Sequence, residues 1–293
     1  MPLTIDSISH IKNIGFVPIG VAEQFSINEK GERYTKIRVT HCCSFPGHSG
    51  LFVNTQVLKD TLQTCFYGFC LLRIIHMIVA MRIKWPSKGI LIVKIDLNAA
   101  YQRVHANPQI AATCIAIVVK LSFLCLCLLF VTTSTPAEYT TISEAEINLG
   151  NDLLADTSWD VTNLQLLHRH LLHKKDYLPA SGPLVKSDQL AMNIESKEAS
   201  MDRFTNDIIT ITIYDPLWVE RTNNAALLII HTIFRPWHSG KTPKLDDPLS
   251  LRKLVVEVQL ARHKTCLGWD TQNRYLRILL PIEKETAWLQ DIR

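Results

Sequence analysis

The sequence predicts an α+β fold, in which a small antiparallel sheet is backed by helices. Residues 90–95, ILIVKI, are a short run rich in β-branched residues, as in a buried strand. Residues 209–213 alternate Ile with Thr after a tight turn at 205–207, which is the pattern of a half-buried strand in a hairpin. Residues 55–85 and 217–234 space their apolar side chains as helices do. These observations together predict helices packed on a small sheet.

The other segments are predicted from the same patterns. Polar, Pro-rich or Gly-rich stretches are expected to be irregular, looped or turned: 1–35, 38–54, 86–89, 179–183 and 235–250. Further helices are expected at 138–156, at the start of 161–185, and at 251–265 and 283–293. The helical pattern of 55–85 is expected to break near Gly68. A second hairpin is expected over 266–281, with its turn at 270–273.

Charge is distributed unevenly along the chain, although the net charge is only +4. Residues 30–94 contain ten Lys or Arg and two acids, whereas residues 138–160 contain six acids and no Lys or Arg. A basic N-terminal half would attract phosphate backbones, or it would simply be a solvated face. The eight cysteines form no Cys-x-x-Cys pair, so we expect reduced, buried thiols rather than zinc ligands.

Residues 110–131 form an apolar run long enough to span a bilayer. Lys120, near its centre, would cost roughly 2.5–3.5 kcal/mol there, and each Leu, Ile, Val or Phe would return about 0.3–0.6 kcal/mol. We expect instead one helix packed behind the strands that end at Asp96 and Asp207, with Lys120 reaching water along its apolar stem. A membrane-spanning helix is the alternative. No signal-peptide pattern begins the sequence, and we expect an intracellular protein, cytoplasmic or nuclear.

Two carboxylates stand at strand ends, Asp96 after residues 90–95 and Asp207 at the tip of the hairpin. Adjacent strands of one sheet could bring them together around a divalent cation. Hard oxygen ligands suit Mg²⁺, and two such ions can clamp the attacking and leaving oxygens of phosphoryl transfer. Spacing alone does not distinguish this site from ordinary solvated acids.

The residues around these acids carry a resemblance. The segment KIDLNAAYQRV, 94–104, resembles the first palm motif of retrotransposon reverse transcriptases, of the LTR and tyrosine-recombinase types. Asp96 and Tyr101 match its metal-binding acid and its aromatic residue. The turn FTND, 204–207, is similar to the family's aromatic-x-Asp-Asp turn, through Phe204 and Asp207.

Three further segments extend the resemblance over about residues 38–289, in the family's order. RVTHCCSFPGHSGLFVN, 38–54, is like the fingers segment. LLFVTTSTPAEY, 128–139, looks like the second palm motif through four matching residues: Leu128, Phe130, Pro136 and Tyr139. HKTCLGWDTQNRYLRILLP, 263–281, resembles the Lys-bearing segment and primer-grip hairpin, again through four: Lys264, Leu267, Gly268 and Trp269.

The resemblance implies a polymerase fingers–palm with a partial thumb or connection. Its expected parts are an irregular segment 1–37, fingers and palm over 38–215, and the end of the palm, the primer grip and the start of the thumb over 216–293. The partners would be an RNA or DNA template–primer and a deoxynucleoside triphosphate, without a small-molecule cofactor. The implied reaction is template-directed nucleotidyl transfer.

The resemblance also implies a role for individual residues. Asp96 and Asp207 would hold Mg²⁺ or Mn²⁺, with Asn206 beside them as the third position of the catalytic set. Tyr101 would exclude a ribose 2′-hydroxyl, and Lys264 would contact the nucleotide as a phosphate or proton-donor residue. Four residues would lie along the template and primer: Phe130, Pro136, Gly268 and Trp269.

The departures from the family pattern predict lost activity. Asn206 stands where the first acid of the turn is expected, and an amide offers a carbonyl oxygen but no negative charge. Val131 stands in place of Gly, Leu129 in place of Pro and Cys42 in place of Asp. We therefore expect a degenerate, truncated reverse transcriptase that is inactive or impaired. A non-catalytic nucleic-acid-binding remnant and a membrane-anchored protein are the alternatives.

Overall fold

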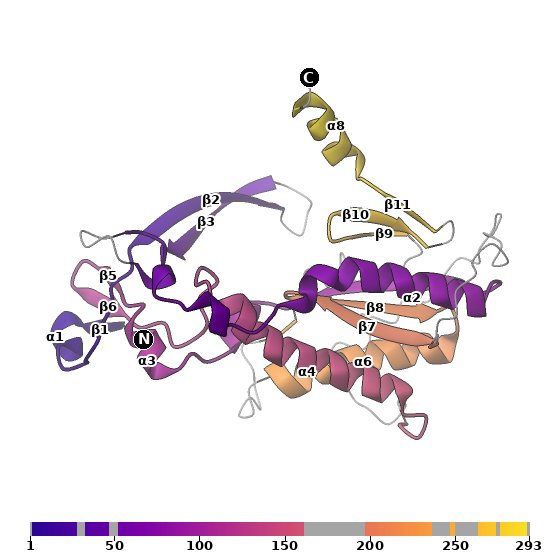
Figure 1. Cartoon of the computed structure of the whole chain (residues 1–293), viewed down its shortest axis with the longest axis horizontal. Helices are drawn as coiled ribbons and strands as arrows, with labels where there is room; N and C mark the ends of the chain where they lie inside the picture. The colour runs from indigo at the N-terminus through magenta and orange to yellow at the C-terminus, as the bar shows by residue number, and fades with distance from the viewer. Residues whose placement is uncertain are drawn as a thin grey trace. The chain divides into compact units, whose positions relative to one another are not determined.

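The chain forms two compact units, each assembled from separate stretches of sequence (Figure 1). The computed structural model describes residues 2–27, 33–46, 52–160, 197–235, 247–249, 263–273 and 276–291. Unit 1 comprises Met1–Cys65 and Ala99–Thr141, and unit 2 comprises Phe66–Asn98 and Ile142–Arg293. The described elements are of mixed α and β type with small antiparallel sheets, which confirms that part of the predicted fold.

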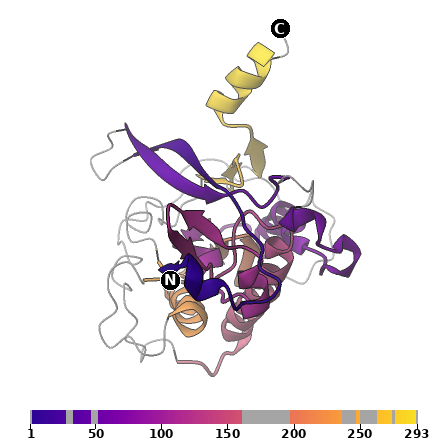
Figure 2. The same cartoon turned by 90° about the vertical axis from the view of Figure 1, so that its left-hand side faces the viewer.

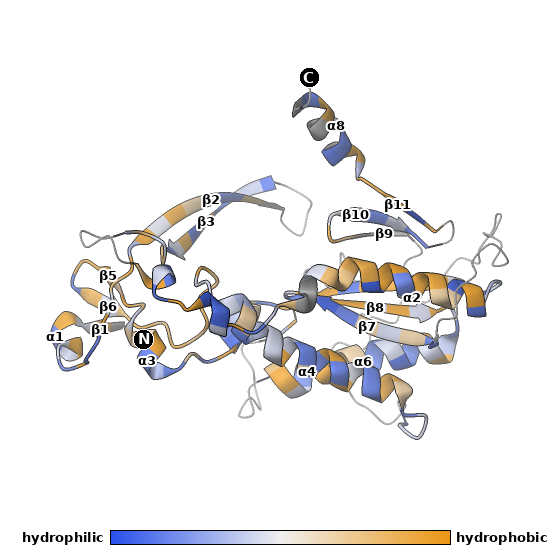
Figure 3. Cartoon of the chain, viewed as in Figure 1, coloured by the Kyte–Doolittle hydropathy of each residue, from blue (hydrophilic) through white to orange (hydrophobic). Residues whose placement is uncertain are grey.

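Unit 2 is built around a three-stranded antiparallel sheet of order β4-β8-β7. Its strands are β4 (Ile90–Asp96), β7 (Ala199–Phe204) and β8 (Asp207–Ile213). Helix α2 (Cys70–Lys84) covers one face, while α4 (Thr135–Ala155) and α6 (Pro216–Phe234) lie on the other (Figure 1). Both faces are covered, so β4 and β8 are buried along almost their whole length, and α2 is mostly apolar (Figure 3).

The core of unit 2 lies between the sheet and α2. It gathers buried side chains of α2, β4 and β8 around Ile74, Ile92 and Ile211. Cys266 joins this core from a second sheet of order β11-β10-β9, made of β9 (His263–Cys266), β10 (Trp269–Gln272) and β11 (Arg277–Leu279). The last described helix is α8 (Ile282–Asp291).

Unit 1 contains a long β-hairpin and a small sheet. The hairpin pairs β2 (Ile19–Ile27) with β3 (Arg33–His41) over their whole length as a twisted ribbon (Figure 2). The sheet has the order β1-β6-β5, with strands Pro2–Thr4, Leu121–Phe123 and Ala116–Val118. Short helices complete the unit: α1 (Ile5–Ile8), α3 (Pro108–Ala112) and the 3-10 turns η1 (Val53–Thr55), η2 (Lys59–Thr61) and η4 (Ala100–Arg103).

The prediction of one helix over residues 110–131 is wrong. This run forms the end of α3, then β5 and β6, which are joined by a two-residue turn at Val119 and Lys120. Consecutive β-branched residues before Lys120 favour strand over helix, and a turn exposes the Lys ammonium directly to water. Within the described ranges, none of the helices combines the length and apolar character needed to cross a membrane.

Three other expectations need correction. Residues 1–35 are not irregular throughout, because they contain β1, α1 and β2 and the start of β3. Residues 55–85 hold a single α-helix, α2, preceded by 3-10 turns that include η3 (Phe66–Phe69). The hairpin of 266–281 turns first at Leu267 and Gly268, not at 270–273, because these two residues have positive φ angles of 54° and 79°.

The strand at 90–95, the hairpin around 205–207 and the helices at 138–156, 217–234 and 283–293 are confirmed within a few residues. The helix expected at the start of 161–185 and the loop at 179–183 lie outside the described residues. So do most of the predicted loop 235–250 and helix 251–265. Of the latter, residues 263–265 belong to β9.

The first test concerns the core of unit 2. Ile92 is fully buried in the central sheet, so Ile92→Ala should lower the free energy of unfolding by about 2–5 kcal/mol through lost packing and a residual cavity. Leu217→Ala, at a position 60% exposed on α6, should change it by less than about 0.5 kcal/mol. All six tryptophans belong to unit 2, so urea unfolding followed by Trp fluorescence reports on this unit.

Candidate active site

Asp96 and Asp207 lie side by side in the central sheet of unit 2. Asp96 ends β4, Asp207 begins β8, and the antiparallel register makes them direct partners. The prediction that the two carboxylates meet at adjacent strand ends is therefore confirmed. Because side chains alternate along a strand, Lys94 points to the same face as Asp96. The site therefore combines two acids and one ammonium.

Asn206 occupies the two-residue turn between β7 and β8, after Thr205, whose φ angle is +52°. Its side-chain Nδ2 donates a hydrogen bond of 2.7 Å to Oδ1 of Asp96. Its Oδ1 accepts a 3.1 Å hydrogen bond from the Thr205 hydroxyl, and its backbone oxygen accepts one of 3.2 Å from Leu97 N–H. The amide therefore presents its NH₂ group, rather than its carbonyl oxygen, to the carboxylate.

Asp207 is paired with Lys94 and yet resists ionisation. The Lys94 Nζ lies 3.1 Å from Asp207 Oδ2, and both side chains are mostly buried. Burial raises the pKa of the Asp207 carboxyl above its usual value, and the adjacent Asp96 raises it further, although Lys94 partly lowers it. The two acids thus share a site in which a second negative charge is disfavoured.

A buried ion pair supports the turn that carries Asn206. The guanidinium of Arg203 on β7 contacts the carboxylate of Glu146 on α4, and both side chains are almost wholly inaccessible to water. The Nε of Arg203 donates a hydrogen bond to the carbonyl oxygen of Thr205. The guanidinium also lies over the ring of Phe234 on α6, 5.8 Å from its centroid. Strand β7, α4 and α6 are thereby tied to the Thr205–Asn206 turn.

The segment that resembles a primer grip, residues 263–281, also belongs to unit 2, and its strand β9 lies near the carboxylates. Lys264 is on β9, Gly268 in the following turn and Trp269 at the start of β10. Burial raises the pKa of the Cys266 thiol to about 11, while Lys94 and Lys264 lower it and Asp207 raises it. The end of β9 is therefore within electrostatic reach of the acid pair.

The remaining residues implied by the resemblance belong to unit 1. Tyr101 on η4 packs against Phe130 and Tyr139, with ring centroids 5.4 and 4.6 Å apart. Pro136 lies in the first turn of α4. Residues of the two segments that resemble palm motifs therefore meet within unit 1, where Tyr101 is a packed aromatic side chain.

The sequence alone did not predict two contacts that matter for the candidate site. Asn54 joins the fingers segment to the second motif, because its Nδ2 donates to Val131 O at 3.0 Å and its Oδ1 accepts from Thr133 N–H at 2.8 Å. The Glu146–Arg203 pair was also missed. In the sequence, the pair is indicated only by Glu146, an acid on the inward face of the helix predicted at 138–156. Its position does not identify Arg203 as the partner.

Asp96 and Asp207 are the two residues that could hold a divalent cation in this site. Mg²⁺ is often bound by one or two carboxylates, with water and substrate phosphates completing its shell, so the pair fits such an ion. Asn206 fits less well, because its NH₂ group faces Asp96. Among the described residues, His, Cys, Asp and Glu side chains form no group of three suited to a metal ion. Neither a protein-family model nor a curated protein matches this sequence.

The acid pair can be tested by titration. Lys94→Met should raise the pKa of Asp207 further, because an attractive charge and a hydrogen bond are lost, whereas Asp96→Asn should lower it by removing a like charge. Carboxyl chemical shifts measured by NMR against pH would report both changes. A shift in the same direction for both variants would contradict the described electrostatics.

The raised pKa of Asp207 also predicts how the stability of the chain depends on pH. Since the pKa of Asp207 is higher in the folded than in the unfolded chain, its stabilising contribution is present at low pH and is lost as the pH rises through the folded pKa. Between acid and neutral pH, Lys94→Met should therefore lose more unfolding free energy than the unsubstituted chain, and Asp96→Asn should lose less. Urea unfolding at several pH values measures this ordering.

The buried ion pair gives a third prediction. Glu146→Ala leaves the Arg203 cation buried without its partner, and should cost about 3–5 kcal/mol of unfolding free energy. Glu144→Ala, two residues earlier on the same helix, removes an acid that makes no ion pair among the described residues, and should cost less than about 0.5 kcal/mol. If Glu146→Met with Arg203→Met is as unstable as Glu146→Ala, an unpaired charge is not the cause.

Proposed function

We propose that this chain is a reverse-transcriptase-like protein of retrotransposon origin, with a fingers–palm fold whose polymerase chemistry is impaired or lost. The observation that carries the proposal is the register of β4 against β8, which sets Asp96 beside Asp207, with Asn206 in the turn from β7 to β8. Both residues lie in segments that resemble palm motifs. The contact of Asn54 with the second motif adds support, because it joins two more of the resembling segments.

The proposed chemistry is template-directed nucleotidyl transfer to a primer 3′-hydroxyl. The oxygen of that hydroxyl would attack the α-phosphorus of a deoxynucleoside triphosphate, and pyrophosphate would leave. A divalent cation, when bound, would stabilise the charge on the reacting oxygens. Asp96 and Asp207 would hold it, Lys264 would bind phosphate oxygens, and Trp269 would support the primer end.

The impairment follows from the contacts that the two acids already make within the chain. Asn206 already bonds to Asp96, and Lys94 already pairs with Asp207, so cation binding must compete with both contacts. The raised pKa of Asp207 adds a further cost, because binding a cation requires the carboxylate form. Asn206 contributes no charge that would offset these costs, whereas the negative charge of a carboxylate in its place would offset them.

A second candidate function, non-catalytic nucleic-acid binding, is favoured by the β2–β3 hairpin of unit 1. In unit 2 several of the basic residues counted in the sequence are engaged: Arg73 with Asp202, Lys88 with Asp215 and Lys94 with Asp207. The hairpin exposes three basic residues and two aromatic ones: Arg33, Lys36, Arg38, Phe25 and Tyr34. Among these, the Arg33 guanidinium lies over the Phe25 ring, 3.8 Å from its centroid. Exposed basic and aromatic side chains together suit phosphate contacts and base stacking.

Restoring the missing acid tests the first proposal. Asn206→Asp should lower the thermal midpoint without metal, because it sets a like charge beside Asp96, and added Mg²⁺ should recover it. Calorimetric Mg²⁺ affinity should rise about tenfold or more over the unsubstituted chain. Asn13→Asp, at an exposed position of unit 1, is the control and should leave Mg²⁺ affinity unchanged.

Activity is measured separately by primer extension with Mg²⁺ and with Mn²⁺. Asn206→Asp alone, or combined with Val131→Gly, should extend a primer better than the unsubstituted chain does. Equal extension by the unsubstituted chain and the Asn206→Asp variant would show that this acid does not limit metal chemistry. Loss of nucleic-acid binding on replacing Arg33, Lys36 and Arg38 with Gln, with no extension by any variant, would favour the second function.

A further inference from the structure

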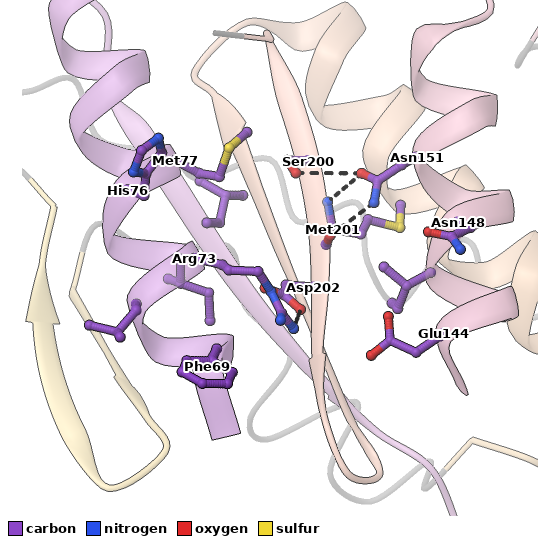
Figure 4. A pocket seen from close by; sticks show the side chains of 14 residues that line it. Phe69, Arg73, His76, Met77, Glu144, Asn148, Asn151, Ser200, Met201 and Asp202 are labelled. Carbon is purple, nitrogen blue, oxygen red and sulfur yellow. Dashed lines mark hydrogen bonds and ion pairs between the residues drawn. The ribbon is translucent and has the colours of Figure 1, made fainter. Parts of the chain in front are cut away.

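Unit 2 contains a cavity of about 720 Å³ (Figure 4), and neither Asp96 nor Asp207 lines it. It opens between α2, α4 and the edge strand β7. Its apolar lining includes Ile74, Met77, Ile147, Met201 and Ile211, contributed by both helices and the sheet. The volume falls within the range of roughly 300–1,000 Å³ typical of small-molecule sites. Two Met side chains can adapt to ligands of different shape.

The edge of β7 beside the cavity is already closed, so the cavity is not a place for an added strand. Asn151 of α4 bonds to both backbone groups of Met201: its Nδ2 donates to the carbonyl at 3.0 Å, and its Oδ1 accepts from the N–H at 2.9 Å. The next outward N–H of β7, that of Arg203, donates to Asp202 Oδ1 at 2.6 Å. These contacts satisfy the groups that an incoming strand would need.

The charges around the cavity are unbalanced. Arg73 of α2 forms two hydrogen bonds with Asp202, at 2.6 and 2.7 Å, so this pair is nearly neutral. Glu144 reaches toward the cavity from α4 (Figure 4). Its charge acts on Arg73 and helps to raise the pKa of that guanidinium, but no hydrogen bond or ion pair engages Glu144 among the residues that the structure describes. Counting His76 as neutral, the lining carries one positive and two negative charges, a net charge of −1.

We propose that this cavity binds a small amphipathic cation. The apolar body of the ligand packs on the Ile and Met side chains, and its ammonium group pairs with Glu144. Asn148, one turn further along α4, lies at the same wall and can accept a second hydrogen bond from the ammonium. The proposal does not depend on the polymerase ancestry, because neither Asp96 nor Asp207 lines the cavity.

A matched pair of probes tests the proposal: 4-phenylbutylamine and its neutral counterpart 4-phenylbutan-1-ol. The full chain should bind the amine about three- to tenfold more tightly than the alcohol, since a partly exposed charged contact contributes on that order. Calorimetry measures the two affinities. Amide NMR shifts locate the binding and should cluster on α2, α4 and β7.

Four variants distinguish binding in this cavity from binding elsewhere on the chain. Glu144→Gln should abolish the preference for the amine, whereas Asp152→Asn, at an exposed position of the same helix, should retain it. Asn148→Trp, at the exposed rim, should weaken both probes by filling the entrance without disturbing the core. Asp207→Asn should leave binding intact.

Three results would overturn the proposal: equal binding of amine and alcohol, an unchanged preference in Glu144→Gln, or loss of amine binding in Asp207→Asn. The last would place the ammonium at the acid pair instead. Because Glu144 and Asn148 are not core residues, thermal midpoints close to that of the unsubstituted chain are expected for their variants. These midpoints confirm that the binding comparison is made on folded protein.

Discussion

The pairing of β4 with β8 is the constraint on which the candidate active site depends. Seven consecutive residue pairs set Asp96 opposite Asp207 and place Lys94 on the same face. A slip of one residue would send all three side chains to the opposite face, toward α4 and α6. Burial of Ile92 and Ile211 against α2 prevents that slip, because it would transfer the whole apolar set of one face to the other. The apolar core therefore holds the acids in place.

Around this pairing, several charged and polar side chains of unit 2 contact one another. Asp96 accepts a hydrogen bond from Asn206, and Asp207 pairs with Lys94. The turn from β7 to β8 is held by Arg203, which in turn pairs with Glu146. Each contact reduces the cost of burying an acid near another acid. The same contacts reduce the gain that a bound cation would bring. In the function that we propose, these contacts would preserve the shape of the strand pair while lowering its affinity for metal.

Much of unit 2 could be predicted because its signals are local. The β-branched run before Asp96 and the Ile–Thr alternation after Asp207 identify the strands of the acid pair. Asp215 and Pro216 form the capped start of α6, where the Asp215 side chain accepts from Leu217 N–H. In unit 1 the apolar run around Lys120 gave the wrong prediction of a single helix. Total hydrophobicity does not distinguish a helix from two short strands and a turn.

The sequence by itself determined the elements of the central sheet, the two acids at its strand ends and the presence of Asn206 in the turn before Asp207. These are properties of neighbouring residues and of their periodicity. Only the tertiary structure decided that the Asn206 amide turns its NH₂ group to Asp96, that Glu146 finds Arg203, and that Glu144 faces a cavity with no ion-pair partner among the described residues. The physical reason is that the spacing of apolar residues indicates which face of an element is buried, whereas the residues that pack against that face come from a distant part of the chain.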